Sequence, residues 1–167
     1  DLFIEYFNQH PEVKLIIAPH VIDENHLVEI IRKLKRPYVR YTRANEKNVR
    51  KADCLIIDCF GLLSSIYRYG EIAYIGGGFG VGIHNTLEAA VYGIPVIFGP
   101  KYQKFQEAIQ LLETKGAFSV KDYEELKTLL DRMLTDEVFL RESGMNASNY
   151  VTSNAGATDK IMSMINF

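Results

Sequence analysis

Short, almost entirely apolar runs recur along the chain, and segments with helical periodicity separate them. The apolar runs that we expect to form strands are 13–18, 38–41, 54–57, 72–75, 96–98 and 117–120. The expected helices are 2–7, 23–35, 62–69, 85–92, 105–115, 122–134, 137–151 and 157–165. Asp23 and Asp122 stand where an N-cap would start two of them. Buried strands with helices between them predict an α/β fold with a doubly wound, Rossmann-like parallel sheet, in a single domain over residues 1–167.

Bulk properties exclude several classes of protein. A length of 167 residues suits one full hydrophobic core, and a net charge of −2 does not indicate a nucleic-acid partner. Cys54 and Cys59, with four scattered histidines, lack the spacing of a zinc site, so we predict no metal, and two free cysteines fit a reducing compartment. No apolar run approaches the roughly 20 residues that span a bilayer, and no signal peptide is visible. The chain lacks an initiator Met, so we expect a fragment of a longer protein.

One stretch departs from this even charge balance. Between Arg32 and Lys51 there are nine Lys or Arg residues, and the only acidic residue is Glu46. Such a run is usually a solvated helix end and loop. It also fits a local anion site, for a carboxylate, a phosphate or an anionic membrane surface.

The most informative motif is a glycine-rich loop that follows the expected strand 72–75. Five glycines fall within residues 76–82, and a helix is expected directly afterwards. Glycine lets a ligand approach the backbone closely, and a helix N-terminus offers free N–H groups to a phosphate. Neither the G-x-G-x-x-G nor the P-loop pattern is present, which argues against a classical dehydrogenase and a P-loop NTPase.

The polar residues at the end of this loop have two interpretations each. Asn85 and Glu88 have the spacing of a capping box, and Glu88 is also placed to accept hydrogen bonds from a ribose. His84 is either a structural histidine or a contact for a phosphate or sugar. His20, just after the first expected strand, is placed similarly, because parallel sheets bind ligands beyond the carboxyl ends of their strands.

Several strings resemble the 3-deoxy-D-manno-octulosonic acid (Kdo) transferases, which build the inner core of lipopolysaccharide. The donor-binding motif of that family is similar to YIGGGF at 74–79 followed by GIHNTLEAA at 82–90. Further matches are IAPH at 17–20, DCFGLL at 58–63, IPVIFGP at 94–100 and FQEA at 105–108. They cover roughly residues 13–120 in the family's order.

The resemblance implies a two-domain GT-B glycosyltransferase, of which this chain would be the C-terminal donor-binding half. It implies CMP-Kdo as donor, lipid A or its precursor as acceptor, and an inverting transfer with no metal or other cofactor. The general base, the membrane anchor and most acceptor contacts are expected in the missing N-terminal domain, so no catalytic residue is expected in this chain. The full-length enzyme would act at the cytoplasmic face of the bacterial inner membrane, and no nucleic acid is an expected partner.

Site residues carry over by position in the matched strings. Pro19 and His20 would line the cytidine or phosphate region, and Phe60, Gly61 and Leu62 would flank the base. The loop residues that would approach the phosphate and donor sugar are Gly77, Gly78, Phe79, Gly80, Gly82 and His84. Asn85 would contact the phosphate or sugar, and Glu88 the ribose.

The sequence also departs from the family's pattern. Many members have an Arg between the positions matched by Pro19 and His20, so another basic residue is needed here; the candidates are Arg40, Arg43 and Lys101. Two alternatives stay open: another GT-B enzyme such as a UDP-sugar transferase or UDP-sugar 2-epimerase, or a non-catalytic anion-binding module.

Overall fold

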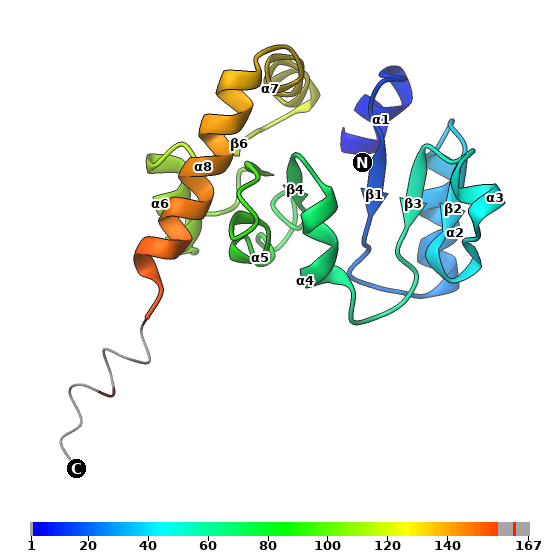
Figure 1. Ribbon diagram of the computed structural model, residues 1–167, viewed down its shortest axis with the longest axis horizontal. Helices are drawn as coiled ribbons and strands as arrows, with labels where there is room; N and C mark the ends of the chain where they lie inside the picture. Colours follow the sequence, from blue (N-terminus) through cyan, green and yellow to red (C-terminus); the bar gives the residue numbers. More distant parts are fainter. Residues whose placement is uncertain (1, 157–161, 163–167) are drawn as a thin grey trace. The chain divides into compact units, whose positions relative to one another are not determined.

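A computed structural model describes residues 2–156 and Met162, and its α/β architecture confirms the predicted fold class (Figure 1). The helix expected over 157–165 lies outside the described residues, apart from Met162. The chain forms two compact units: unit 1 holds residues 1–70 and 122–127, and unit 2 holds residues 71–121 and 128–167. The single domain expected over 1–167 stays a prediction.

Unit 1 is built on a parallel three-stranded sheet. Its strands are β1 (Leu15–Ile17), β2 (Tyr38–Arg40) and β3 (Cys54–Ile56), in the order β1-β3-β2. Leu15 and Tyr38 both stand opposite Cys54, so the three strands run in register. The helical segments are α1 (Leu2–Gln9), α2 (Glu24–Lys33), η1 (Tyr41–Arg43), α3 (Glu46–Val49), α4 (Leu63–Ile66) and η2 (Tyr67–Tyr69).

The core of unit 1 lies between this sheet and the helices α1 and α2. Its buried members are Ile4, Phe7, Leu15, Leu27, Ile30, Cys54 and Ile56. Asp23 caps α2 as predicted, because its side chain accepts a hydrogen bond from the backbone N–H of His26. Burial raises the pKa of the Cys54 thiol to about 12, so this cysteine behaves as a core residue.

Unit 2 contains a second parallel sheet. Its strands are β4 (Ala73–Ile75), β5 (Val96–Phe98) and β6 (Ala117–Ser119), in that order. Its helices are α5 (Leu87–Ala90), α6 (Gln106–Glu113) and α8 (Glu137–Asn154), and α7 (Tyr123–Thr135) begins in the residues counted with unit 1. All three residues of β5, the central strand, are fully buried, which matches the continuous apolar run in the sequence.

Glycine lets α8 approach the rest of unit 2 closely. A Cβ on Gly144 would lie 2.1 Å from the carbonyl oxygen of Gly93, and a Cβ on Gly116 would lie 2.7 Å from the backbone of Ala147. Gly116 directly follows the expected helix 105–115, so the sequence favours it as the glycine that ends α6. Instead Lys115 adopts the left-handed conformation, with φ 59°, and Gly116 is required by the contact with α8.

Two other expectations need adjustment. The six expected strands form two hydrogen-bonded sheets of three in the described part of the chain, where one continuous sheet was expected. The helix expected over 85–92 is shorter, since α5 has four residues, Leu87–Ala90. Among the described residues, no helix combines the length and apolar character needed to cross a membrane.

Candidate functional site

The glycine-rich loop begins directly after β4 and folds back on itself. The carbonyl oxygen of Gly77 accepts hydrogen bonds from the N–H groups of Gly80 (2.8 Å) and Gly82 (3.3 Å). The N–H of His84 donates to the carbonyl of Gly76 (3.2 Å), which closes the base of the loop. The loop is therefore held by its own backbone, with little help from side chains.

Two of the glycines are required by this path. Gly77 has φ +88°, and a Cβ there would lie 2.1 Å from the carbonyl oxygen of Gly82. A Cβ on Gly78 would lie 2.6 Å from the backbone nitrogen of Gly99, in the loop that follows β5. The backbones after β4 and β5 thus touch each other directly at Gly78 and Gly99.

The tip of the loop has a different character. A Cβ on Gly80 would meet its nearest neighbour, the Gly77 carbonyl oxygen, at 3.5 Å, and Gly80 does not have a left-handed φ. Phe79 is exposed, and Val81 is fully exposed. The backbone N–H groups of Phe79 and Val81 donate to no protein acceptor in the part of the chain that the structure describes. The tip therefore offers backbone donors and open space to a bound anion.

Asn85 and Glu88 are joined through their side chains at the start of α5. Asn85 Oδ1 accepts from the N–H of Leu87 (3.0 Å), and Asn85 Nδ2 donates to Glu88 Oε1 (3.0 Å). The reciprocal capping box is not formed, because Glu88 contacts the Asn85 side chain and not its backbone. One carboxylate oxygen of Glu88 is used in this way, and the other has no protein donor among the described residues.

Thr86, between them, is a residue that the sequence did not single out. Its side chain is fully buried, and its hydroxyl oxygen has no hydrogen-bond partner in the described residues. Buried polar atoms in folded proteins are normally paired, so this turn has unused hydrogen-bonding capacity. An isolated threonine in a short helical pattern gives no sequence signal for it.

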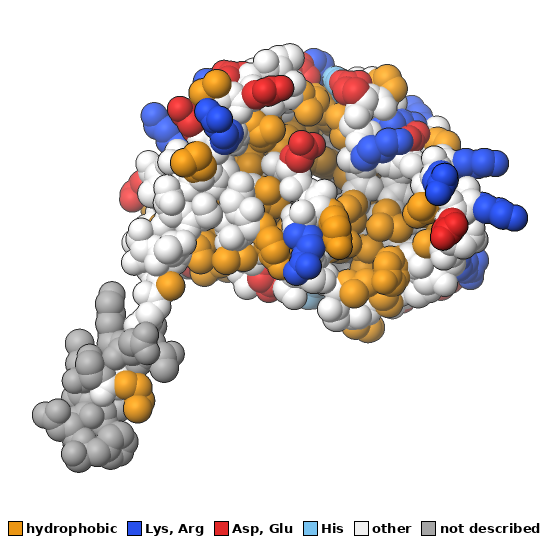
Figure 2. Space-filling model, in the orientation of Figure 1, with side chains coloured by type: hydrophobic (Ala, Val, Ile, Leu, Met, Phe, Trp, Pro, Cys, Tyr) orange, Lys and Arg blue, Asp and Glu red, His pale blue; other side chains and the backbone are white. Residues whose placement is uncertain are grey.

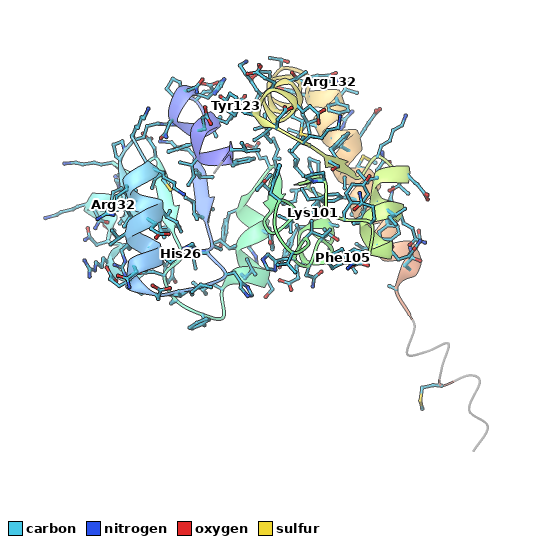
Figure 3. The ribbon with its side chains drawn as sticks, turned by 180° about the vertical axis from the view of Figure 1, so that it is seen from behind. His26, Arg32, Lys101, Phe105, Tyr123 and Arg132 are labelled. Carbon is cyan, nitrogen blue, oxygen red and sulfur yellow. The ribbon has the colours of Figure 1, made fainter. Side chains whose placement is uncertain are left out.

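The loop after β5 supplies a basic residue beside the glycines. The N–H of Lys101 donates to the carbonyl of Gly78 (3.0 Å), and the ring of Phe105 lies against Gly82. Lys101 and Phe105 both belong to the segment between β5 and α6 (Figure 3). Lys101 is exposed, and its ammonium has no partner in the described chain. Lys101, one of the three basic candidates for an anion contact, thus stands beside the loop.

The remaining predicted site residues lie in unit 1. Pro19 and His20 follow β1, and Phe60, Gly61 and Leu62 follow β3. Because β1 and β3 are adjacent and parallel, the loops that follow them leave the same edge of the sheet. Gly61 has φ +86° with open space around its Cα, and Phe60 is 82% exposed, so this loop presents an aromatic ring to solvent.

The structure therefore assembles the predicted site in two separate sets. Unit 2 brings together Gly77, Gly78, Phe79, Gly80, Gly82, His84, Asn85 and Glu88. The ring of His84 lies over Gly76 and Gly77. Unit 1 brings together Pro19, His20 and the segment 60–62.

Unit 1 also contains a charge network that sequence reasoning did not find. The carboxylate of Asp58 accepts hydrogen bonds from Arg40 Nε (2.7 Å), the Thr42 N–H (2.9 Å) and the Thr42 hydroxyl (2.6 Å). Arg40 also donates to both carboxylate oxygens of Glu24, at 2.8 and 3.0 Å. Arg40 thus uses its Nε and Nη1 groups within this network, and its role as the replacement for the missing family Arg stays a prediction.

This network ties together the loops after β2 and β3 and the start of α2. Burial alone would raise the pKa of Asp58, but the hydrogen bonds from Thr42 and Arg40 outweigh it and lower the pKa to about 2. The same contacts, first with Glu24 and then with Asp58, raise the pKa of Arg40. The sequence signal is an Asp directly after a buried strand, which local pattern alone cannot pair with Arg40.

This depressed pKa predicts acid-sensitive stability. Since the folded pKa of Asp58 lies below the unfolded value of 3.8, its contribution is present above about pH 4 and lost as the pH falls towards 2. The loss should amount to about 2 kcal/mol, from roughly 1.4 kcal/mol per pKa unit. Denaturant unfolding between pH 5 and 2.5 should show a steeper decline for the native chain than for Asp58→Asn. Identical pH slopes for the two would contradict the assignment.

None of the described residues form a cluster of three or more His, Cys, Asp or Glu side chains that could hold a metal ion. Both Cys54 and Cys59 are free thiols. The chemistry available at the glycine loop is therefore that of backbone N–H groups, Lys101, Asn85 and Glu88, which suits the binding of a phosphorylated ligand with hydroxyl groups.

Comparison with solved structures finds a chain of similar fold. The C-terminal CMP-Kdo binding domain of WaaA from Acinetobacter baumannii superposes with a TM-score of 0.76 at 19% identity, over 90% of this chain and 79% of that one. The chain therefore shares the fold of that domain. No family model matches the chain.

Sequence comparison identifies the family. The chain is 36% identical over 135 residues to the 3-deoxy-D-manno-octulosonic acid transferase of Aquifex aeolicus, covering 80% of this chain and 37% of that protein. The enzyme of the same name from Chlamydia muridarum is 28% identical over 92% of this chain and 36% of its own length. The chain belongs to the 3-deoxy-D-manno-octulosonic acid transferase family, and it spans just over a third of the length of these curated relatives.

Proposed function

We propose that the chain is the donor-binding part of a Kdo transferase that moves Kdo from CMP-Kdo to lipid A or its precursor. The observation that carries the proposal is the loop 76–82, whose backbone is folded against Gly99 and whose tip presents free N–H groups. The relatives support the activity by their name, and the solved WaaA domain supports the donor by its description. The complete enzyme would work at the cytoplasmic face of the inner membrane.

The donor's anionic groups are assigned to the tip of the loop. The N–H groups of Phe79 and Val81 and the ammonium of Lys101 would hold the phosphate or the sugar carboxylate. The dipole of α5 adds little, because this helix has only four residues.

The ribose is assigned to Glu88, whose second carboxylate oxygen is not used within the described chain. Asn85 would orient this carboxylate through the hydrogen bond seen in the structure. The cytidine contacts of Pro19, His20, Phe60, Gly61 and Leu62, in unit 1, rest on the family resemblance alone, and the exposed ring of Phe60 is available for stacking on a base.

In the reaction, the bond between the anomeric carbon and the phosphate oxygen breaks, and CMP leaves with the electron pair. The loop and Lys101 would stabilise the charge that develops on that phosphate. A base outside this chain would take the proton of the acceptor hydroxyl, whose oxygen forms the new bond to the sugar. Neither a metal nor a cofactor has a step in this scheme.

Calorimetric titration with CMP, CDP and UDP tests the donor assignment. We expect preference for CMP, and Glu88→Ala should weaken CMP binding by about tenfold or more, as loss of a charged hydrogen bond costs roughly 1.5–3 kcal/mol. Glu113→Ala is the matched control, because Glu113 is an exposed glutamate in the last turn of α6. A preference for UDP would indicate a UDP-sugar enzyme, and no binding of any of the three would refute the proposal.

A further inference from the structure

The basic stretch 32–51 contains two kinds of cation. Arg36 and Arg40 are largely buried, and their guanidinium groups form ion pairs within unit 1, with Asp53 and Asp58 respectively. The other cations are exposed on α2, η1, α3 and the turns beside them. Six of these have no partner for the charged group among the described residues: Arg32, Lys35, Arg43, Lys47, Arg50 and Lys51. We call these six residues the basic face.

The basic face is dense in positive charge. The only acidic residue between Arg32 and Lys51 is Glu46. Helix α2 carries two acids: Glu24 is paired with Arg40, and Glu29 lies 3.8 Å from His26. Figure 2 shows Lys and Arg side chains gathered over the part of unit 1 that holds α2 and α3. Arg32 lies on α2, exposed (Figure 3). A chain with a net charge of −2 thus concentrates unpaired cations on one small unit.

Exposed apolar side chains lie among these cations. Tyr38 is 43% exposed, and Tyr41 and Val49 are each 45% exposed. A hollow of about 440 Å³ lies between α2 and the edge strand β2. It is lined by Glu24, Val28, Ile31, Tyr38, Val39, Arg40 and Arg43. The surface therefore combines an apolar floor, tyrosines and a cationic border.

We infer that the basic face of unit 1 docks on an anionic lipid surface. Lysine and arginine near such a surface are attracted by its negative potential, and tyrosine prefers the boundary between lipid headgroups and water. The apolar floor beside β2 and the exposed Val49 suit shallow contact with acyl chains, which a nucleic-acid backbone would not use. The face shares no residue with the glycine loop, so this inference stands or falls independently of nucleotide binding.

The test is co-sedimentation of the chain with vesicles of phosphatidylcholine alone and with vesicles containing phosphatidylglycerol. Binding is expected only to the anionic vesicles, and it should weaken as salt is raised. The triple variant Arg32→Gln, Lys47→Gln, Arg50→Gln should lower the partition coefficient about a hundredfold, since each cation near the surface contributes roughly fivefold. The control removes three exposed cations of unit 2, as Lys104→Gln, Lys115→Gln, Arg141→Gln.

The possible outcomes of this experiment can be told apart. Retained binding in the control together with loss in the triple variant supports the inference. Equal partition into both kinds of vesicle, equal loss in both variants, or no vesicle binding at all would overturn it. Tighter binding to single-stranded DNA than to the anionic vesicles at the same salt would also overturn it, in favour of a nucleic-acid partner. Displacement from the vesicles by millimolar inorganic phosphate would indicate a site for a free anion instead.

Discussion

Replacement of Arg36 by Met should lower the free energy of unfolding of unit 1 by about 3–5 kcal/mol, because one guanidinium satisfies several backbone carbonyls. Arg36 donates hydrogen bonds of 2.8–2.9 Å to the carbonyl oxygens of Phe7, His10, Pro11 and Val13. Its guanidinium carbon also lies 4.0 Å from the centre of the Phe7 ring, and Nη2 is 3.3 Å from Asp53 Oδ2.

Methionine would keep much of the packing volume but none of the donors. The carbonyls of Pro11 and Val13 would then lose the donor that Arg36 supplies, and those of Phe7 and His10 would keep only the backbone N–H groups of His10 and Val13. Asp53 would lose one of its two cations, leaving Lys14. Arg36→Lys should recover only part of the loss, because an ammonium cannot match the planar fork of a guanidinium.

Denaturant unfolding followed by far-UV circular dichroism measures this effect. Hydrogen exchange of the amides in 2–17 assigns the effect to the region that Arg36 holds. Arg32→Met makes the same chemical change on the exposed surface of α2 and should alter stability by less than about 0.5 kcal/mol. A similar loss in both variants would show that the carbonyl contacts of Arg36 contribute little.

The strands of this fold were predictable because burial is encoded in a local pattern. Val96, Ile97 and Phe98 form a continuous apolar run, and all three are fully buried in β5. The N-cap at Asp23 was predictable for a similar reason, since a capping side chain bonds to a backbone N–H only three residues away. Features that depend on residues close together in the sequence could thus be predicted from the sequence alone.

The sequence predicted that Gly93 ends the helix before it, but it could not predict what packs against that turn, because the contact is made by a distant part of the chain. The N–H groups of Tyr92 and Gly93 turn back to carbonyls three residues earlier, and Gly93 adopts φ +71°. The carbonyl oxygen of Gly93 itself lies 2.1 Å from where a Cβ on Gly144, in α8, would stand. The tight turn after α5 therefore accommodates a helix that begins more than forty residues later in the chain.

The candidate site also combines features that the sequence pattern predicts with features that depend on distant contacts. The glycine content of 76–82 indicated a ligand-binding loop, but the sequence could not separate glycines needed by the fold from glycines open to a ligand. The structure assigns Gly77 and Gly78 to the fold, since added Cβ atoms would overlap backbone atoms of Gly82 and Gly99. Gly80 has no such obstacle within the protein. Its place at the tip of the loop is the position at which a ligand would exclude a side chain.

This assignment leads to opposite expectations for two neighbouring substitutions. Gly78→Ala should lower the free energy of unfolding of unit 2 by about 1–3 kcal/mol or more, because the methyl group forces the loops after β4 and β5 apart. Nucleotide binding should be lost as well, since the tip of the loop and Lys101 would move away from each other; Lys101 is bonded to the carbonyl of Gly78 itself.

Gly80→Ala should leave unfolding within about 0.5 kcal/mol of the native chain, or stabilise it slightly, because alanine restricts the unfolded chain more than glycine does. Affinity for CMP should nevertheless fall by about tenfold or more, which corresponds to roughly 1.4 kcal/mol. Thermal unfolding and calorimetric titration of both variants separate stability from binding. If Gly80→Ala bound CMP as tightly as the native chain, the phosphate could not lie against the tip of this loop, and the donor would have to be placed elsewhere in unit 2.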